Sequence, residues 1–208
     1  MKRSVRLLLS LSLVLAAAGV RAADVTVSGF GTLGYAISDK PYSYQRYIDE
    51  QGTFDRDSRL AVQVDAALSR RWSATAQLKF APDEDSDSRW APRLSWGFLS
   101  WRPDDDWLLR VGKLRIPMYL GAESMDVGVS FDYARLPIEV YSIAPTLDFT
   151  GASVTRSWDV GRGELSVDGY WGKTRSNWRQ YARDGVPGYL AAGPVFASID
   201  VVARGLAL

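Results

Sequence analysis

The chain has 208 residues, of which 25 are lysine or arginine and 24 are aspartate or glutamate, and it contains neither histidine nor cysteine. Without histidine it lacks the commonest general base and metal ligand, and without cysteine it lacks thiolate chemistry and disulfides. The composition therefore disfavours an enzyme, and we expect no catalytic residue, no metal site and no cofactor.

Residues 1–22 have the pattern of a secretory signal peptide. A basic start is followed by an apolar run from Leu7 to Val20 and by Arg21-Ala22 before Ala23. The run is shorter than the roughly 20 apolar residues of a membrane-spanning helix. We therefore expect a cleaved signal peptide and export from the cytoplasm.

Removal of this segment changes the charge balance. It takes away four bases and no acid, which leaves 21 bases against 24 acids and a net charge of −3. Charges dispersed in this way disfavour binding to nucleic acid, which requires clustered lysine and arginine.

Period-two alternation of apolar and polar residues predicts β-strands in the rest of the chain. In chain order the predicted strands are 24–38, 58–69, 72–80, 94–102, 107–114, 147–158, 165–171 and 195–203. The alternation is weaker in 94–102 and 107–114, and 147–158 is predicted as a strand mainly because its neighbours require one. Such strands are typical of a membrane β-barrel, in which one face meets lipid and the other meets water.

The lengths of the connections support the same architecture, because bacterial outer-membrane barrels alternate short periplasmic turns with long outer loops. The predicted connections alternate long and short throughout: 39–57, 70–71, 81–93, 103–106, 115–146, 159–163 and 172–194. The sequence therefore predicts an all-β fold, an antiparallel transmembrane β-barrel in which residues 23–208 form one unit.

Half of the eight tryptophans lie close to a predicted short turn: Trp72, Trp101, Trp107 and Trp158. Tryptophan favours the membrane interface, so this clustering indicates an aromatic girdle. Trp101 falls on the less apolar parity of its strand and weakens that interpretation.

Two segments resemble the outer-membrane porins of proteobacteria. Residues 27–35, VSGFGTLGY, resemble the first strand of these porins, and residues 109–117, LRVGKLRIP, resemble the strand that leads into their third loop. The resemblance implies a channel of typically sixteen strands whose third loop folds into the lumen and narrows it. It also implies the outer membrane as the location and a homotrimer as a possible assembly.

Two differences from that family limit the comparison. Porins are nearly twice as long and end in an aromatic residue, whereas this chain ends at 203–208, in mid-strand by its alternation, which continues past residue 203. We therefore expect about eight strands here, as the N-terminal half of a longer barrel. The loop 115–146 also lacks the acidic-Gly-Gly stretch of the best-known porins, so their constriction cannot be transferred in detail.

A completed barrel would enclose water, and its selectivity would depend on the charges at its narrowest section. The loop candidates for pore-lining or constriction residues are Arg115, Glu123, Asp126, Asp132, Arg135 and Glu139. The candidates on the facing wall are Arg59, Gln63, Asp65, Lys79, Arg110 and Asp168. Loop acids facing wall bases would set up a field that tunes ion preference. We expect a porin for passive diffusion of small hydrophilic solutes and ions, with the lipid bilayer as its other partner.

Other functions fit parts of the sequence. A small, complete eight-stranded barrel would have its lumen filled by side chains and would serve a structural or adhesion role. An outer-membrane hydrolase or acyltransferase would need a Ser-His pair that the composition does not provide. The acidic run 83–87 could bind a divalent cation, but it lacks the glycine turn and the distal glutamate of an EF-hand, which favours a solvated loop.

Overall fold

In a computed structural model the chain folds into a single antiparallel sheet of eight strands. The structure describes residues 24–43, 47–83, 90–119, 121–133, 135–141, 144, 146–182, 185, 187–189 and 192–208. The strands are β1 (Asp24–Thr32), β2 (Arg59–Ala67), β3 (Trp72–Ala81), β4 (Ala91–Trp101), β5 (Trp107–Arg115), β6 (Asp148–Val160), β7 (Gly163–Ala182) and β8 (Gly193–Ala207). Each strand pairs with its neighbours in the sequence, so the all-β class and the strand order are confirmed. The predicted signal peptide, 1–22, lies outside the described residues, as does most of the acidic run, 84–87.

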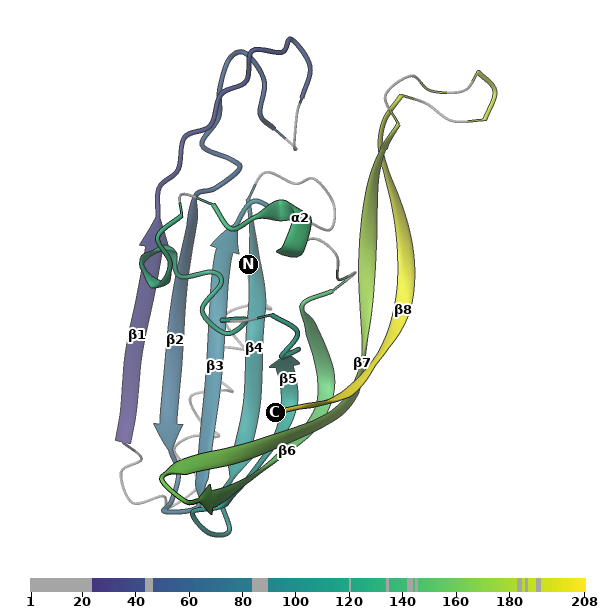
Figure 1. The fold of residues 1–208 in the computed structure, drawn as a ribbon. Coiled ribbons are helices and arrows are strands. Elements are labelled where there is room, and N and C mark those ends of the chain that lie inside the picture. The colour runs from purple at the N-terminus through teal and green to yellow at the C-terminus, as the bar shows by residue number, and fades with distance from the viewer. Residues whose placement is uncertain are drawn as a thin grey trace, which may run out of the picture.

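The sheet forms an open trough. Strands β6–β8 curl forward from the plane of β1–β5, and the connection between β5 and β6 lies on the concave side (Figure 1). This connection holds the two short helices, η1 (Gly128–Ser130) and α2 (Ile138–Tyr141). The eight strands are not closed into a barrel: among the described strands β1 and β8 are the edges of the sheet and do not pair with each other. None of the helices in the described ranges is long and apolar enough to cross a membrane.

The convex face of the sheet presents exposed apolar side chains on every strand, with charged residues among them on β6, β7 and β8. Strand register places one large apolar side chain after another on this face: Val27, Val64, Leu78, Leu99, Val111, Val154, Trp171 and Leu206. Val27 is 66% exposed, Val111 62% and Leu206 80%. Exposed apolar side chains thus recur across all eight strands, and large exposed apolar patches mark interaction surfaces.

A β-bulge in β4 explains the weak alternation that the sequence shows there. Gln77 pairs with Trp96 and Leu78 pairs with Leu94, so Ser95 is an extra residue on β4. The parity of the strand therefore changes at Ser95, and Trp101 lies on the convex face.

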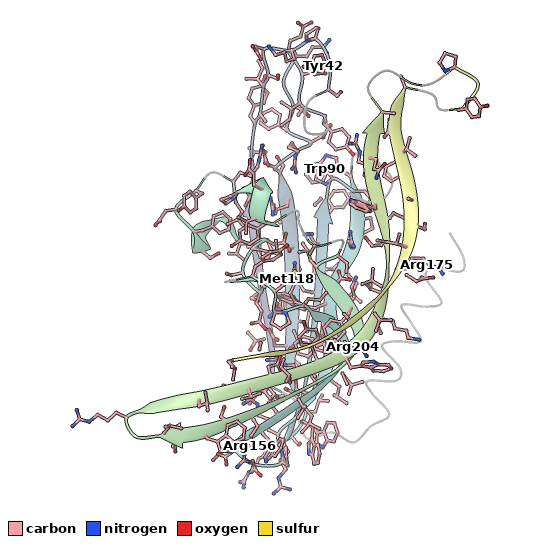
Figure 2. The ribbon with its side chains drawn as sticks, turned by 45° about the vertical axis from the view of Figure 1, so that its right-hand side comes forward. Tyr42, Trp90, Met118, Arg156, Arg175 and Arg204 are labelled. Carbon is pink, nitrogen blue, oxygen red and sulfur yellow. The ribbon has the colours of Figure 1, made fainter. Side chains whose placement is uncertain are left out.

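The tryptophans near the short turns form contacts on that convex face. The Trp101 ring stacks on Trp72 with a centroid distance of 5.8 Å. The Arg156 guanidinium lies over Trp107 and Trp158, at 4.8 and 5.6 Å from their centroids, at the end of the sheet where the short turns lie (Figure 2). The parity assigned to Trp101 from the sequence was wrong, and the four tryptophans share one end and one face.

The first strand ends earlier than the sequence predicts. It was expected to continue to residue 38 but ends at Thr32. The hydroxyl of Ser58 accepts a hydrogen bond from the Gly34 N–H at 3.1 Å and donates one to the Gly34 carbonyl at 3.2 Å. A side chain thus replaces the backbone ladder at this position.

The hairpin of β7 and β8 is longer than predicted. The sequence indicates a strand over 165–171 and a long connection over 172–194, whereas pairing continues to Ala182 and resumes at Gly193. At about 3.3 Å per residue the 20 residues of β7 span roughly 66 Å, well over the roughly 25 Å apolar band of an outer-membrane barrel. Beyond residue 172 the sequence is polar on both parities, so hydrophobic alternation cannot reveal the extension.

Candidate functional site

The connection from Ile116 to Leu147 lies against the concave face of the sheet. Its ends are joined by a hydrogen bond from the Ile116 N–H to the Leu147 carbonyl at 3.0 Å. Ile116 also packs with the inward side chains of β5, β6 and β8, which form a small apolar core: Leu114, Phe149 and Ala203. Met118 lies in the part of the connection that crosses the sheet (Figure 2). The connection is therefore anchored to the concave face rather than extended away from it.

Asp126 joins this connection to three strands of the wall. One carboxylate oxygen is 3.1 Å from Arg59 Nη1 of β2 and 2.9 Å from Lys79 Nζ of β3. The other is 3.0 Å from Arg115 Nη2 at the end of β5. We call Asp126 and these three bases the Asp126 cluster. Four of the residues that the sequence nominated for the constriction are thus brought together.

The cluster is shielded from solvent, so the attraction between Asp126 and the three bases is screened only weakly. The side chains of Asp126 and Arg115 are 10% and 8% exposed. Burial by itself raises the pKa of the Asp126 carboxyl. The neighbouring cations outweigh that effect, first through the Coulomb attraction of Lys79 and then that of Arg115, and hold this pKa well below its usual range. Asp126 is therefore an anion at any physiological pH.

Strand register explains why the bases converge. Lys79 is the cross-strand partner of Ala61, and Arg59 lies two residues from Ala61 on the same face of β2. The small buried Ala61 leaves room beside it for both long side chains. Arg115 reaches the cluster from β5 and also places its guanidinium 5.4 Å from the centroid of the Trp96 ring.

A second carboxylate, which the sequence analysis did not select, repeats this arrangement next to the cluster. Asp148, the first residue of β6, lies 3.3 Å from Lys113 Nζ and 3.9 Å from Arg93 Nη2. Asp148 carried no signal in the sequence because it begins a strand without clear alternation. Only the three-dimensional structure shows that these side chains, from β4, β5 and β6, meet.

A cavity of about 690 Å³ lies between the concave face and the loop, and other residues that the sequence nominated for the constriction line it. Its lining includes Asp65, Arg110, Glu123 and Asp168. Arg110 Nη1 lies 3.6 Å from Glu123 Oε1, which is a second contact between wall and loop. Aromatic side chains of the wall and the loop, Trp96, Phe98, Tyr119, Phe149 and Tyr170, also line the cavity.

Two acids of the wall that line this cavity are hydrogen-bonded to side chains of their own strand or of a neighbouring strand. Asp65 accepts hydrogen bonds from the Thr75 hydroxyl at 2.7 Å and from the Gln63 amide at 2.8 Å. Asp168 accepts one from the Thr155 hydroxyl at 2.8 Å. These acids belong to the polar concave wall, and none of their hydrogen bonds described here reaches the Asp126 cluster.

The remaining nominated residues lie elsewhere in the loop. Arg135 forms a two-point ion pair with Asp57 of the connection between β1 and β2, with Nε 2.9 Å from Oδ1. Asp132 is exposed and does not line this cavity, and Glu139 is exposed on α2. Arg135 therefore fastens the loop to another loop, and the sequence prediction that treats all six loop charges alike does not distinguish these roles.

Within the described ranges no three acidic side chains gather in a group that could hold a metal ion. Comparison with known proteins adds no assignment, since neither the models of known protein families nor the curated proteins contain a match to this chain.

Proposed function

We propose that this chain is part of an outer-membrane β-barrel that forms a water-filled channel for passive diffusion of small hydrophilic solutes and ions. In this proposal the eight strands form part of the barrel wall, the convex face meets lipid and the concave face lines the lumen. The connection 115–146 is the constriction loop. The Asp126 cluster lies where that loop is held to the wall.

The observation that carries the proposal is the opposite chemistry of the two faces of one sheet. The convex face presents apolar side chains on all eight strands, with tryptophans at the end formed by the short turns. The concave face carries a polar network: Trp96 Nε1 and Gln77 Nε2 both donate to Gln63 Oε1, at 3.2 and 3.0 Å. A soluble sheet buries its apolar face, whereas a barrel wall in a membrane exposes it to lipid.

The loop supplies the second support. A long outer loop that serves only as a surface feature would extend into solvent, as long loops generally do. Here the loop lies on the polar face and pairs its acids with bases of the wall, through Asp126 and through Glu123. In this proposal the loop narrows the lumen beside the wall and places charged side chains of the loop and the wall at its narrowest section, where width and charge set the selectivity of a channel.

Planar bilayer recording with the natural protein, purified from its own outer membranes, tests the proposal. We expect stepwise increases in conductance as single molecules insert. The Asp126→Asn variant should change the size of the step, because it removes a charge at the loop, while Asp132→Asn, an exposed acid of the same loop, should change it far less.

An absence of steps from protein that is inserted in the bilayer would refute the channel. If the same protein is a folded, heat-modifiable barrel, a structural or adhesion role replaces the channel.

Export through a signal peptide is part of the same proposal. The mature protein from the outer membrane should then begin close to Ala23, which sequencing of its N-terminus measures. Recovery of protein that still begins at Met1 would contradict cleavage.

A further inference from the structure

We propose that the outer part of the β7–β8 hairpin binds the phosphate-bearing headgroup of an anionic lipid on the convex face of the sheet. The inference rests on the proposed function, in which this face meets the lipid bilayer. It adds a site on the lipid side of the wall, on the face opposite to the loop and its cavity.

Strand register places three bases close together on the convex face of this hairpin. Trp171, which is 58% exposed on that face, pairs with Arg204, and the next position of β7 on the same face is Lys173. Arg175 follows, opposite Asp200. All three bases are exposed, and Arg175 and Arg204 both lie along the hairpin (Figure 2). We call Lys173, Arg175 and Arg204 the hairpin bases.

The hairpin bases outnumber the acid that faces them. Asp200 is the acid of β7 and β8 on the convex face, and it forms a two-point ion pair with Arg175, with Nε 2.8 Å from Oδ1 and Nη2 3.2 Å from Oδ2. Among the described residues no acid forms an ion pair with Lys173 or Arg204. Three bases against one acid leave two positive charges on an exposed surface.

The other acids on this side of the sheet do not cancel that excess. Asp148 is the acid of β6 with the same strand parity, but its side chain is 14% exposed and already pairs with a base of β4 and a base of β5. β7 continues from Lys173 to Ala182, which is roughly 30 Å at about 3.3 Å per residue, so the end of the strand lies well beyond a screening length of about 10 Å. The acidic run 84–87 follows β3, which lies four strands from β7 in the sheet.

The hairpin bases lie at the height expected for lipid headgroups. Lys173 lies ten residues from the start of β7 at Gly163, which is roughly 33 Å along the strand at about 3.3 Å per residue. In a strand tilted by about 40° this length rises roughly 25 Å, which is the height of the apolar band of an outer-membrane barrel. The same face of β7 carries Leu165, Val167 and Trp171 below Lys173, and tryptophan favours the membrane interface. The bases therefore begin where the apolar band ends.

The other strands carry a different chemistry at their outer ends. On the convex face β2 ends with Leu60 and β3 with Phe80, which are 56% and 44% exposed. Phe80 packs against Trp90, which lies just before β4, with a centroid distance of 5.1 Å. Apolar side chains fit the acyl chains of any lipid, whereas exposed bases beside the apolar band favour an anionic headgroup. The preference for such a headgroup therefore belongs to β7 and β8 and not to β2–β4.

The two bases without an acidic partner match a phosphate group in geometry. Lys173 and Arg204 are diagonal cross-strand neighbours, since each lies one same-face position from the pair of Trp171 with Arg204 or belongs to it. Such neighbours lie roughly 7–8 Å apart, within reach of long side chains, so one phosphate can contact both. The guanidinium donates two parallel hydrogen bonds to phosphate oxygens, and the ammonium adds a point charge.

Native mass spectrometry measures the binding. The natural protein, purified from its own outer membranes in a neutral detergent, is titrated with dioleoyl phosphatidic acid and separately with dioleoyl phosphatidylcholine, whose headgroup has no net charge. We expect tighter binding of phosphatidic acid. Lys173→Gln and Arg204→Gln should each weaken that binding roughly fivefold, which corresponds to about 1 kcal/mol for each base near an anionic lipid surface. Both variants should bind phosphatidylcholine as the unchanged protein does.

Arg162→Gln is the matched control, because Arg162 is also exposed but lies in the turn between β6 and β7, at the opposite end of β7. It should bind phosphatidic acid as the unchanged protein does. Equal weakening in this control and in the hairpin variants would show diffuse attraction and overturn the inference. Displacement of phosphatidic acid by inorganic phosphate at constant ionic strength would assign the bases to a free anion and would also overturn it.

Bilayer recording separates failure of this inference from failure of the proposed function. Steps of conductance together with equal binding of the two lipids would leave the channel intact and refute the headgroup site. Preferential binding of phosphatidic acid by a protein that gives no steps would support the headgroup site and refute the channel. Absence of binding by both lipids would refute the assignment of the convex face to lipid, and with it both proposals.

Discussion

Replacement of Asp126 by asparagine should release the loop from the wall. The substitution keeps the shape of the side chain and one oxygen acceptor but leaves three bases of the concave face without their shared anion. A hydrogen bond to a charged group contributes about 1.5–3 kcal/mol, and removal of one partner of a buried ion pair costs about 3–5 kcal/mol. Since Arg59 and Lys79 remain partly exposed, we expect a loss of about 2–4 kcal/mol in the free energy of loop docking, or roughly 30- to 800-fold in its equilibrium constant.

Hydrogen exchange measures this loss directly. Backbone hydrogen bonds within the loop, such as Ser124 N–H to Gly121 carbonyl at 3.0 Å and Val127 N–H to Ser124 carbonyl at 2.8 Å, protect its amides. Exchange at these amides should accelerate by roughly the same factor in Asp126→Asn, while amides in the strands stay protected. Asp132→Asn is the control, because that acid lies in the same loop outside the cluster. Equal exchange in the two variants would refute the assignment of Asp126 as the main anchor.

Three further predictions concern pH, a second loop contact and the convex face. The neighbouring bases hold the pKa of Asp126 below that of an unfolded aspartate, which is about 3.9. The contribution of Asp126 to loop docking is therefore complete above that pH and is lost as the pH falls further. Protection factors of the loop amides should be constant from pH 8 to 5 and decrease only in strong acid. Loss of loop protection at pH 6 would show that a group other than Asp126 controls the docking of the loop. Asp57→Asn should cost about 1 kcal/mol, less than Asp126→Asn, because the partner Arg135 is one third exposed, and limited proteolysis of the loop should rank the two variants in that order. Val111→Lys should lower the unfolding free energy in lipid vesicles by about 2–4 kcal/mol, whereas Ser153→Lys on the concave face of the neighbouring strand should change it little; equal urea midpoints for the two would contradict the assignment of faces.

The sequence predicts the strands best where the two faces meet different surroundings. In β2 and β3 an apolar residue recurs at every second position, and the observed bounds differ from the predicted ones by no more than two residues. Alternation fails in β4, where one inserted residue, Ser95, exchanges the faces of the strand. It also fails in the distal part of β7, where both faces are polar and pairing relies on the backbone and on contacts such as Arg175 with Asp200.

The sequence predicts which charged residues belong to the site but not which of them form ion pairs with one another. The sequence nominates six charges on the loop, and nothing in their order distinguishes Asp126, which is buried, from Asp132, which is exposed. Ion pairs between residues far apart in the sequence, such as Arg59 and Asp126 at a separation of 67 positions, depend on strand register and on the path of the loop, and neither is encoded in a local pattern. Asp57 and Asp148 were missed for the same reason.

Single-cysteine scanning of β2 in the natural membrane tests the central claim most directly, since the chain contains no cysteine of its own. Spin labels attached in turn at positions 61 to 66 report their exposure to lipid-soluble oxygen and to a water-soluble nickel complex. We predict a period of two, with Val62, Val64 and Ala66 reached by oxygen, Gln63 and Asp65 reached by the nickel complex, and the buried position 61 reached poorly by both. Equal access of the nickel complex to all six positions would show that water covers both faces, and would contradict the assignment of the convex face to lipid and the concave face to a lumen.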